Sequence, residues 1–484
     1  MLSFPSDKSG GTVRTVQWTL LTLVMRRALV FCLFLVIARV LTPDALGIFR
    51  EYTLILLALT LAAPVGLDYV HVTARSRHGR TFAALTGLSS LLALVFTVGL
   101  LALAGVIGRL AGSEELAAII RWSAPILLVH VLRHDLKFDL RRRMRLRLLA
   151  AFETTNVFFY ASLTLALLLI FHAPWTLFAG FFAGDILETA LLLAERRRRY
   201  GRAFLPLGRM RTALRVWREH AGYCLSTSGT HLLGLWANQA PVFLLGVLFA
   251  PSWLGIYYLA QQMIGLPVTL LTQSLQNVFF PTFARMNDNE KAHAVKRVVF
   301  AAAGIMWPLL ALYGYALWRL VPVLFGQRWA EALPLIAPLG ALMASHLVMN
   351  PIASIPVALR RSHLELAWRI VSVALLSLAL LFSARLGFAA AIRVYVVVQI
   401  LMHAAFVAII LRLVRLSVPR MFGGLFLLAL PPAALLAAGY MLHNLAWPPA
   451  LATMLIVQLL LYGVVNLLTS GRLWHEMRAV LAVR

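Results

Sequence analysis

Charged residues are scarce in this chain of 484 residues: they make up 13% of it, whereas hydrophobic residues make up 61%. Soluble globular chains carry roughly 25% charged and roughly 45–50% apolar residues. No stretch between the apolar runs is long enough to form a soluble domain of its own. The composition therefore excludes an ordinary soluble fold and favours a chain embedded in a membrane.

Cysteine is nearly absent, and its two copies, Cys32 and Cys224, both fall inside apolar runs. This excludes a disulfide framework and a cysteine-based metal site. The sequence also lacks a Walker loop, a glycine-rich dinucleotide turn, a His-Glu-x-x-His motif and a Gly-x-Ser-x-Gly turn. We therefore expect no cofactor, no metal and no enzymatic activity, and we do not expect ATP to be the direct energy source.

Apolar runs of about 20 residues recur along the whole chain, and each is long enough to cross roughly 30 Å of hydrocarbon. In lipid such runs must be helical, because every backbone polar group needs an internal partner. The sequence predicts an all-α polytopic membrane protein with about fourteen transmembrane helices. The predicted spans are residues 13–40, 45–72, 81–107, 116–131, 149–171, 175–194, 216–249, 253–280, 295–320, 333–352, 364–382, 389–411, 421–442 and 451–468.

Acidic residues are far fewer than basic ones, 18 against 44, and the formal net charge is +26. The basic residues gather in alternate short loops, as is typical of the cytoplasmic loops of membrane proteins. This pattern predicts a bacterial inner-membrane protein with both termini in the cytoplasm. We prefer it to nucleic-acid binding, and the same loops would be attracted to anionic membrane lipids.

Two segments of the chain resemble each other at a constant offset. Residues 41–49 lie between the first two spans, residues 249–257 lie between the seventh and eighth, and both contain proline, leucine, glycine, isoleucine and an aromatic residue in register. Six spans separate the copies, which indicates a parallel repeat of two six-helix bundles with a cleft between them. A chance match of tight turns is the alternative. The predicted lobes are residues 1–200 and 201–415, followed by two further helices and a tail at 416–484.

Four short motifs follow one another in the first 285 residues: ARVLTPDALGIF at 38–49, GLD at 66–68, LGIYYLA at 254–260 with Pro267, and FPTFA at 280–284. In this order they resemble the polysaccharide flippases (Wzx-like) of the multidrug/oligosaccharidyl-lipid/polysaccharide exporter superfamily. The rest of the chain resembles that family mainly in its number of helices.

The resemblance implies that the cargo is an undecaprenyl-diphosphate-linked oligosaccharide. It implies movement from the cytoplasmic to the periplasmic leaflet for O-antigen, capsule or exopolysaccharide synthesis, beside a polymerase and glycosyltransferases of the same pathway. This chain departs from the family where many relatives carry charged residues, because it has Asn238-Gln239 in the seventh span and Gln262 in the eighth. The cargo's sugars and the coupling ion therefore stay open.

Two adjacent arginines, Arg26 and Arg27, lie near the middle of the first span. A charge at that depth costs several kcal/mol, so it usually faces a cavity or a partner. A diphosphate needs a cationic site with several donors, which arginine supplies. We predict that both bind substrate, and that Arg26 faces the cleft because it shares a helix face with threonines. The alternative is that both side chains extend to the inner interface.

Three carboxylates are candidates for ion coupling. Asp68 lies near the inner end of the second span, and Asp185 and Glu188 are three residues apart on one face of the sixth. Each could hold a proton or Na⁺, or pair with arginines of neighbouring helices. Glu153 in the fifth span is a further candidate of the same kind.

Amide side chains recur along the seventh and eighth spans at Asn238, Gln262, Gln273 and Gln276. Because sugars offer many hydroxyl partners, we predict that these residues line the cargo cavity. Contacts between helices are the alternative, since small and polar residues serve this purpose in any membrane bundle.

Two other functions stay open. A membrane glycan polymerase or ligase would need a sizeable outside loop to hold its acceptor, and every predicted outside loop here is short. A drug or metabolite antiporter of the same superfamily would need only twelve helices and a less cationic cleft.

Overall fold

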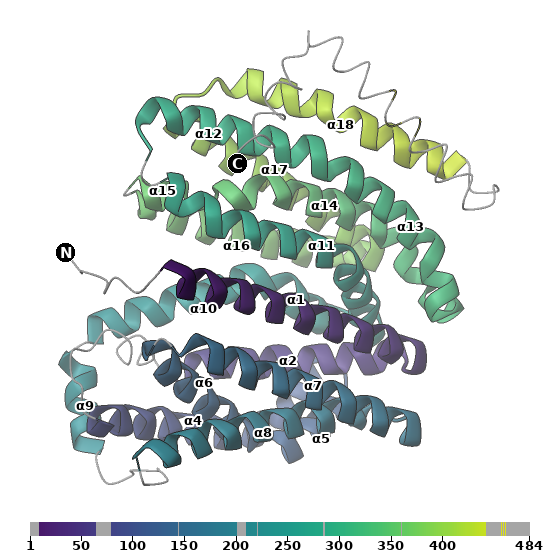
Figure 1. Ribbon diagram of the computed structural model, residues 1–484. Coiled ribbons are helices and arrows are strands. Elements are labelled where there is room, and N and C mark those ends of the chain that lie inside the picture. The colour runs from purple at the N-terminus through teal and green to yellow at the C-terminus, as the bar shows by residue number, and fades with distance from the viewer. Residues whose placement is uncertain are drawn as a thin grey trace. The chain divides into compact units, whose positions relative to one another are not determined.

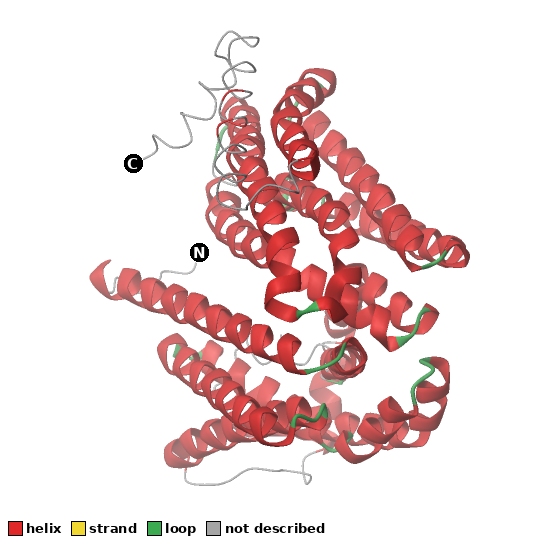
Figure 2. Ribbon diagram, turned by 90° about the vertical axis from the view of Figure 1, so that its right-hand side faces the viewer, coloured by secondary structure: helices red, strands yellow, loops and turns green. Residues whose placement is uncertain are grey.

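The computed structural model describes residues 9–63, 79–143, 145–200, 210–219, 221–283, 286–359 and 361–441, together with residues 456, 458 and 460. Within these ranges every regular element is a helix (Figure 2). The all-α fold class predicted from the apolar runs is therefore confirmed. The contacts divide the chain into two compact units, Met1–Gly255 (unit 1) and Ile256–Arg484 (unit 2).

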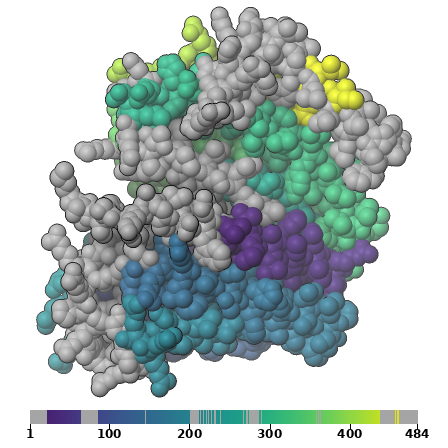
Figure 3. All heavy atoms as spheres, viewed as in Figure 1, coloured from purple at the N-terminus to yellow at the C-terminus, as the bar shows by residue number. Residues whose placement is uncertain are grey.

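Unit 1 is a bundle of helices, most of them long (Figure 1). Its closest helix pairs are α7 with α8 and α1 with α7. Figure 3 shows the purple atoms of α1 beside blue atoms of the same unit. Its helices are α1 (Ser9–Val40), α2 (Pro43–Ala62), α4 (Gly79–Leu110), α5 (Glu114–Ser123), α6 (Ile126–Arg142), α7 (Leu146–Phe171), α8 (Trp175–Tyr200), α9 (Met210–Glu219) and α10 (Ala221–Leu248), followed by the first turn of α11 (Pro251–Phe283).

Unit 2 begins within α11 and contains a second set of long helices (Figure 1). Its core gathers apolar side chains of α12, α14, α17 and α18. After α11 its elements are α12 (Asp288–Ala301), a π-helical turn (Ala302–Met306), α13 (Trp307–Phe325), a 3₁₀ turn (Gln327–Ala332), α14 (Leu333–Ile352), α15 (Ile355–Ala358), α16 (Ser362–Ser383), a 3₁₀ turn (Ala384–Leu386), α17 (Phe388–Leu413) and α18 (Val418–Met441).

Ten helical segments in the described part of the chain are long and apolar enough to cross a membrane. Large apolar side chains on them are open to the surroundings, among them Phe382 at 73% exposure and Ile170 at 68%. Such faces would be unstable in water and suit contact with lipid. The protein is therefore a multi-pass membrane protein, as predicted. The predicted fourteenth span, 451–468, lies outside the described ranges except for three residues, and the count of fourteen stays a prediction.

Two predicted spans differ from the observed helices. Residues 116–131 belong to two helices, α5 and α6, which meet at an angle of 58°. Pro125 lies at this break and cannot donate a backbone hydrogen bond, which explains why the helix bends there. Residues 216–249 are likewise divided between α9, which already begins at Met210, and α10. The predicted lobes 1–200 and 201–415 stay a prediction, because a division into two compact units does not show that the two are copies of one bundle.

Candidate functional site

Unit 1 contains a group of charged side chains between its helices, which we call the buried ion network. It joins three cations to three carboxylates from four helices. Its members are Arg26 of α1, Arg133 and Lys137 of α6, Glu153 of α7, and Asp185 and Glu188 of α8. Because a lone charge inside a membrane costs several kcal/mol, this balance of charges allows the network to be buried.

Helical spacing explains how the sequence builds the network. Arg133 and Lys137 are four residues apart on α6, and Asp185 and Glu188 are three apart on α8, so each pair shares one helix face. Arg133 forms ion pairs with both carboxylates and lies 3.0 Å from Glu188. Lys137 Nζ lies 2.7 Å from the other oxygen of Glu188. The side chain of Glu188 is completely buried, so these two cations replace the water that it lacks.

A histidine and an amide complete the surroundings of the α8 carboxylates. His130 Nδ1 lies 2.7 Å from Asp185, and the Asn156 amide of α7 donates to Glu188 at 2.6 Å. Of the two interpretations that the sequence left open, these contacts favour pairing with cations of a neighbouring helix. A role of Asp185 and Glu188 in ion coupling stays a prediction.

Arg26 joins the network through an ion pair with Glu153, its one ion-pair partner among the described residues. Its guanidinium donates to Glu153, which Lys137 also approaches, at 3.5 Å. The Arg26 Nε is buried and has no hydrogen-bond partner among the described residues, so one donor of the guanidinium is unused. The side chain keeps 16% exposure. Arg27 is exposed and takes no part in the buried ion network among the described residues, and its role in binding stays a prediction.

A second group of polar residues connects α2 with α10, and the sequence analysis did not single it out. The Arg50 guanidinium donates to the Gln239 side chain at 2.6 Å, and Glu51 is buried beside Gly246. The sequence did contain a signal for this group. Arg50 and Glu51 are adjacent charged residues inside a predicted span, and such residues are rare in membrane helices.

The predicted cavity residues are described only in part. Gln262 of α11 lies 3.5 Å from the Tyr258 hydroxyl, a weak contact within its own helix. The side chains of Asn238, Gln273 and Gln276 lie outside the described part of the chain, and so does Asp68. The role of these amides in binding therefore stays a prediction.

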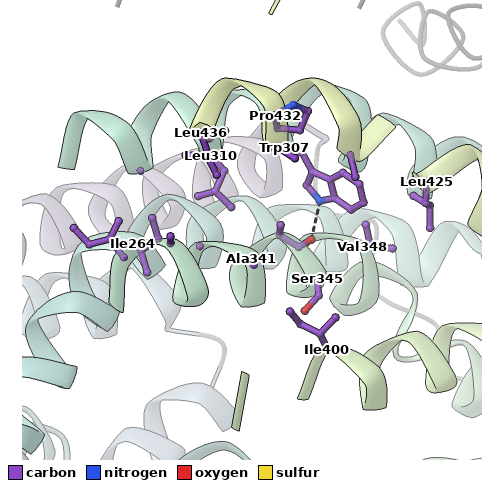
Figure 4. A pocket seen from close by; sticks show the side chains of 18 of the residues that line it. Ile264, Trp307, Leu310, Ala341, Ser345, Val348, Ile400, Leu425, Pro432 and Leu436 are labelled. Atoms are coloured by element: carbon purple, nitrogen blue, oxygen red, sulfur yellow. Dashed lines mark hydrogen bonds between the residues drawn. The ribbon is translucent and has the colours of Figure 1, made fainter. Parts of the chain in front are cut away.

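Unit 2 contains a cavity of about 740 Å³ between its helices. Figure 4 shows Ile264, Leu310 and Leu436 among its lining side chains. One polar element is the Trp307 indole N–H, which donates to the Ala344 carbonyl at 2.8 Å and is thereby satisfied. The lining suits an apolar group and does not offer the cations that a diphosphate requires.

Residues 36–334, more than half of the chain, match the family described as polysaccharide biosynthesis protein. The chain belongs to this family. The membership confirms the resemblance to Wzx-like proteins of the multidrug/oligosaccharidyl-lipid/polysaccharide exporter superfamily that the four motifs suggested. It also confirms the prediction that the chain serves membrane transport in polysaccharide biosynthesis.

Two relatives of this polysaccharide biosynthesis protein carry descriptive names. The succinoglycan biosynthesis transport protein ExoT of Rhizobium meliloti (strain 1021) is 24% identical, over 72% of this chain and 68% of that protein. The teichuronic acid biosynthesis protein TuaB of Bacillus subtilis (strain 168) is 23% identical, over 53% of this chain and 52% of that protein.

Solved structures share the fold. The lipid II flippase MurJ in an inward closed conformation superimposes with a TM-score of 0.67 at 12% identity, covering 93% of this chain and 98% of its own. An inward-facing multidrug resistance transporter of the MATE family gives a TM-score of 0.56 at 14% identity, covering 80% of this chain and 94% of its own. At these identities the likeness concerns the fold alone.

Proposed function

We propose that this polysaccharide biosynthesis protein is a flippase for an undecaprenyl-diphosphate-linked oligosaccharide. It would move each unit from the cytoplasmic to the periplasmic leaflet by alternating access. The observation that carries the proposal is Arg26, a partly buried arginine in a membrane-spanning helix of a family member, with one donor unused. The names of ExoT and TuaB, which refer to the biosynthesis of succinoglycan and of teichuronic acid, support the same class of cargo.

The charge balance of the buried ion network explains how Arg26 can bind an anion. The three cations are matched by three carboxylates, so a diphosphate must compete with a carboxylate for its cation. Arg26 is the cation most easily released, because among the described residues it pairs with one carboxylate, Glu153, whereas Arg133 pairs with two. When Arg26 turns to a diphosphate, Lys137 still lies 3.5 Å from Glu153 and keeps it neutralised.

Arginine suits this exchange for chemical reasons. Its planar guanidinium donates two parallel hydrogen bonds to carboxylate or phosphate oxygens, so Glu153 and a diphosphate are interchangeable partners. The carboxylate holds the guanidinium in place until cargo arrives, and release of the cargo restores the pair. The chain's own residues thus bind and release the headgroup and form no covalent bond, which agrees with a transporter and not with an enzyme.

The test compares the position of lipid-linked units in cells that carry Arg26→Ala with cells that carry the native chain. Membrane vesicles of both orientations are probed with a lectin that recognises the unit. We expect units to accumulate on the cytoplasmic leaflet in the variant at normal protein levels. Arg109→Ala, which removes an exposed arginine at the end of α4, is the matched control and should behave as the native chain.

Two outcomes would contradict the proposal. If single units reach the periplasmic leaflet in cells that lack the protein but are not joined, the missing step is polymerisation or ligation. If the units are distributed normally and susceptibility to toxic compounds changes instead, the protein is an antiporter for drugs or metabolites.

A further inference from the structure

Glu51 of α2 is a buried carboxylate with no hydrogen-bond partner in the described part of the chain. The residue is 7% exposed, and neither carboxylate oxygen has a hydrogen-bond partner among the described residues. An ionised carboxylate in such a place costs several kcal/mol, and the usual resolution is that it binds a proton. The buried ion network resolves the same problem with cations, so Glu51 stands apart from it.

The α10 residue shown against Glu51 is a glycine, Gly246. Gly246 makes the room: a Cβ on Gly246 would lie 2.8 Å from one carboxylate oxygen and 3.2 Å from the Glu51 Cγ. The adjacent Arg50 does not neutralise the carboxylate, because its guanidinium is bound to Gln239 at 2.6 Å. Tyr52, the next residue, packs its ring on Phe178 of α8.

Several of the helices around α2 carry charged groups. None of the described ones forms an ion pair or hydrogen bond with it. On the helices that pack against α2, the titratable and charged side chains described are Cys224 of α10; His130, Arg133, His134, Asp135, Lys137, Asp139 and Arg141 of α6; Asp185, Glu188, Glu195, Arg196, Arg197, Arg198 and Arg199 of α8; Glu114, Glu115 and Arg121 of α5; and Arg109 of α4. The first turn of α11 carries none.

A close backbone contact lies about one helical turn from Glu51, toward the start of α2. Gly47 precedes Glu51 by four residues and therefore shares its helix face. A Cβ on Gly47 would lie 1.9 Å from the Pro251 carbonyl oxygen, and a Cβ on Gly255 would lie 1.9 Å from the Pro43 carbonyl oxygen. The starts of α2 and α11 thus touch backbone to backbone, in a reciprocal contact that we call the glycine seal.

We propose that Glu51 is a proton-binding site that links protonation to closure of the glycine seal. The proposal rests on the proposed alternating access. With the seal closed, the carboxyl group holds its proton and is neutral. When α2 moves away from α10 and α11, water reaches the group and the proton passes to water, leaving a hydrated carboxylate. Rebinding a proton removes the charge and allows the helices to close again.

The direction of the pH effect follows from which state binds the proton. Since the closed state holds the proton and the open state releases it, low pH favours closure and rising pH favours opening. Glutamine at this position is neutral at every pH and has nearly the same shape. It should keep the seal closed where the native carboxyl group would let it open.

The experiment measures the distance between the starts of α2 and α11 by electron paramagnetic resonance. Spin labels are placed at Asp44→Cys and Ser252→Cys in a chain with Cys32→Ser and Cys224→Ser, reconstituted in lipid without cargo. Between about pH 5 and about pH 10, a range that brackets buried carboxyl groups, we expect the short-distance population to fall as pH rises. Glu51→Gln should abolish this change and Glu51→Asp should retain it.

Glu115→Gln, which removes an exposed carboxylate of α5, is the matched control and should leave the pH response intact. A distance distribution that does not change with pH, or one that changes equally in Glu51→Gln, overturns the proposal. Because this readout needs no cargo, it is independent of the flipping assay: a pH-dependent seal in a protein that moves no lipid-linked unit would refute the flippase and not the proton site.

Discussion

Glu153 lies between two cations from different helices, Arg26 of α1 and Lys137 of α6. In a water-poor site a carboxylate that holds an arginine also competes with any other anion for it. The affinity of the protein for a diphosphate is therefore set by Glu153 as well as by Arg26. At the scale of single residues, a substitution of Glu153 tests this competition while it leaves the Arg26 cation in place.

Glu153→Gln should increase the affinity for undecaprenyl diphosphate by about tenfold, which corresponds to roughly 1.4 kcal/mol. Removal of the carboxylate frees the guanidinium, while the amide keeps the shape of the side chain. The affinity is measured on purified protein by thermophoresis, with Glu115→Gln as the control for loss of one negative charge. An unchanged or weaker affinity would mean that Arg26 does not bind the diphosphate.

The residues that the sequence identified and those that it missed differ in a physical way. The spacing of Asp185 and Glu188 predicts that they share a face, because helical geometry is local. Their cation partners are not local: Arg133 is 52 residues from Asp185 along the chain. Glu51 was missed although a charged residue inside a span was an available signal. That Gly246 makes room for its carboxylate, and that neither oxygen has a hydrogen-bond partner among the described residues, is shown only by the packing of α2 on α10.

At the scale of elements, the repeated motifs at residues 41–49 and 249–257 have a structural reason. Each supplies a proline whose carbonyl faces the glycine of the other copy. The glycines are required because a Cβ at either position would meet a backbone oxygen that cannot turn away. The match found in the sequence thus coincides with a contact between the two copies.

Gly47→Ala should destabilise the protein by about 1–3 kcal/mol, because a methyl group must be fitted against a fixed carbonyl. Gly255→Ala should have a similar effect, and the double variant should lose less than the sum since both residues serve one contact. The measurement is thermal unfolding in detergent. Gly99→Ala is the matched control, because a Cβ there meets nothing within 4 Å. Equal stability of Gly47→Ala and Gly99→Ala would exclude the glycine seal.

Helix ends show how far the sequence determines the elements. The third, fifth and tenth predicted spans agree closely with α4, α7 and α14, because a change from apolar to polar residues marks each end. The bend between α5 and α6 was not predicted. Apolar residues continue across Pro125, so hydropathy alone does not register the missing hydrogen bond.

At the scale of the whole molecule, the positions of the basic residues predict on which side of the membrane each loop lies, which the helix bounds alone do not. Basic residues concentrate in alternate loops, among them the segments 133–147, 196–218 and 412–420. If these loops are cytoplasmic, the number of spans must be even for both termini to lie inside. A membrane protein of this composition should therefore place its C-terminal tail in the cytoplasm.

Green fluorescent protein fused after Arg484 should fluoresce, because it folds in the cytoplasm and not when exported in an unfolded state. A fusion after Asn444, beyond the thirteenth predicted span, should be dark. The measurement is fluorescence per unit of fusion protein. The predicted outer loop at His172 gives an independent control. His172→Cys should react with an impermeant thiol reagent added outside intact spheroplasts. A bright fusion at Asn444 together with a dark one at Arg484 would contradict this orientation and would place the arginine-rich loops on the outer side of the membrane.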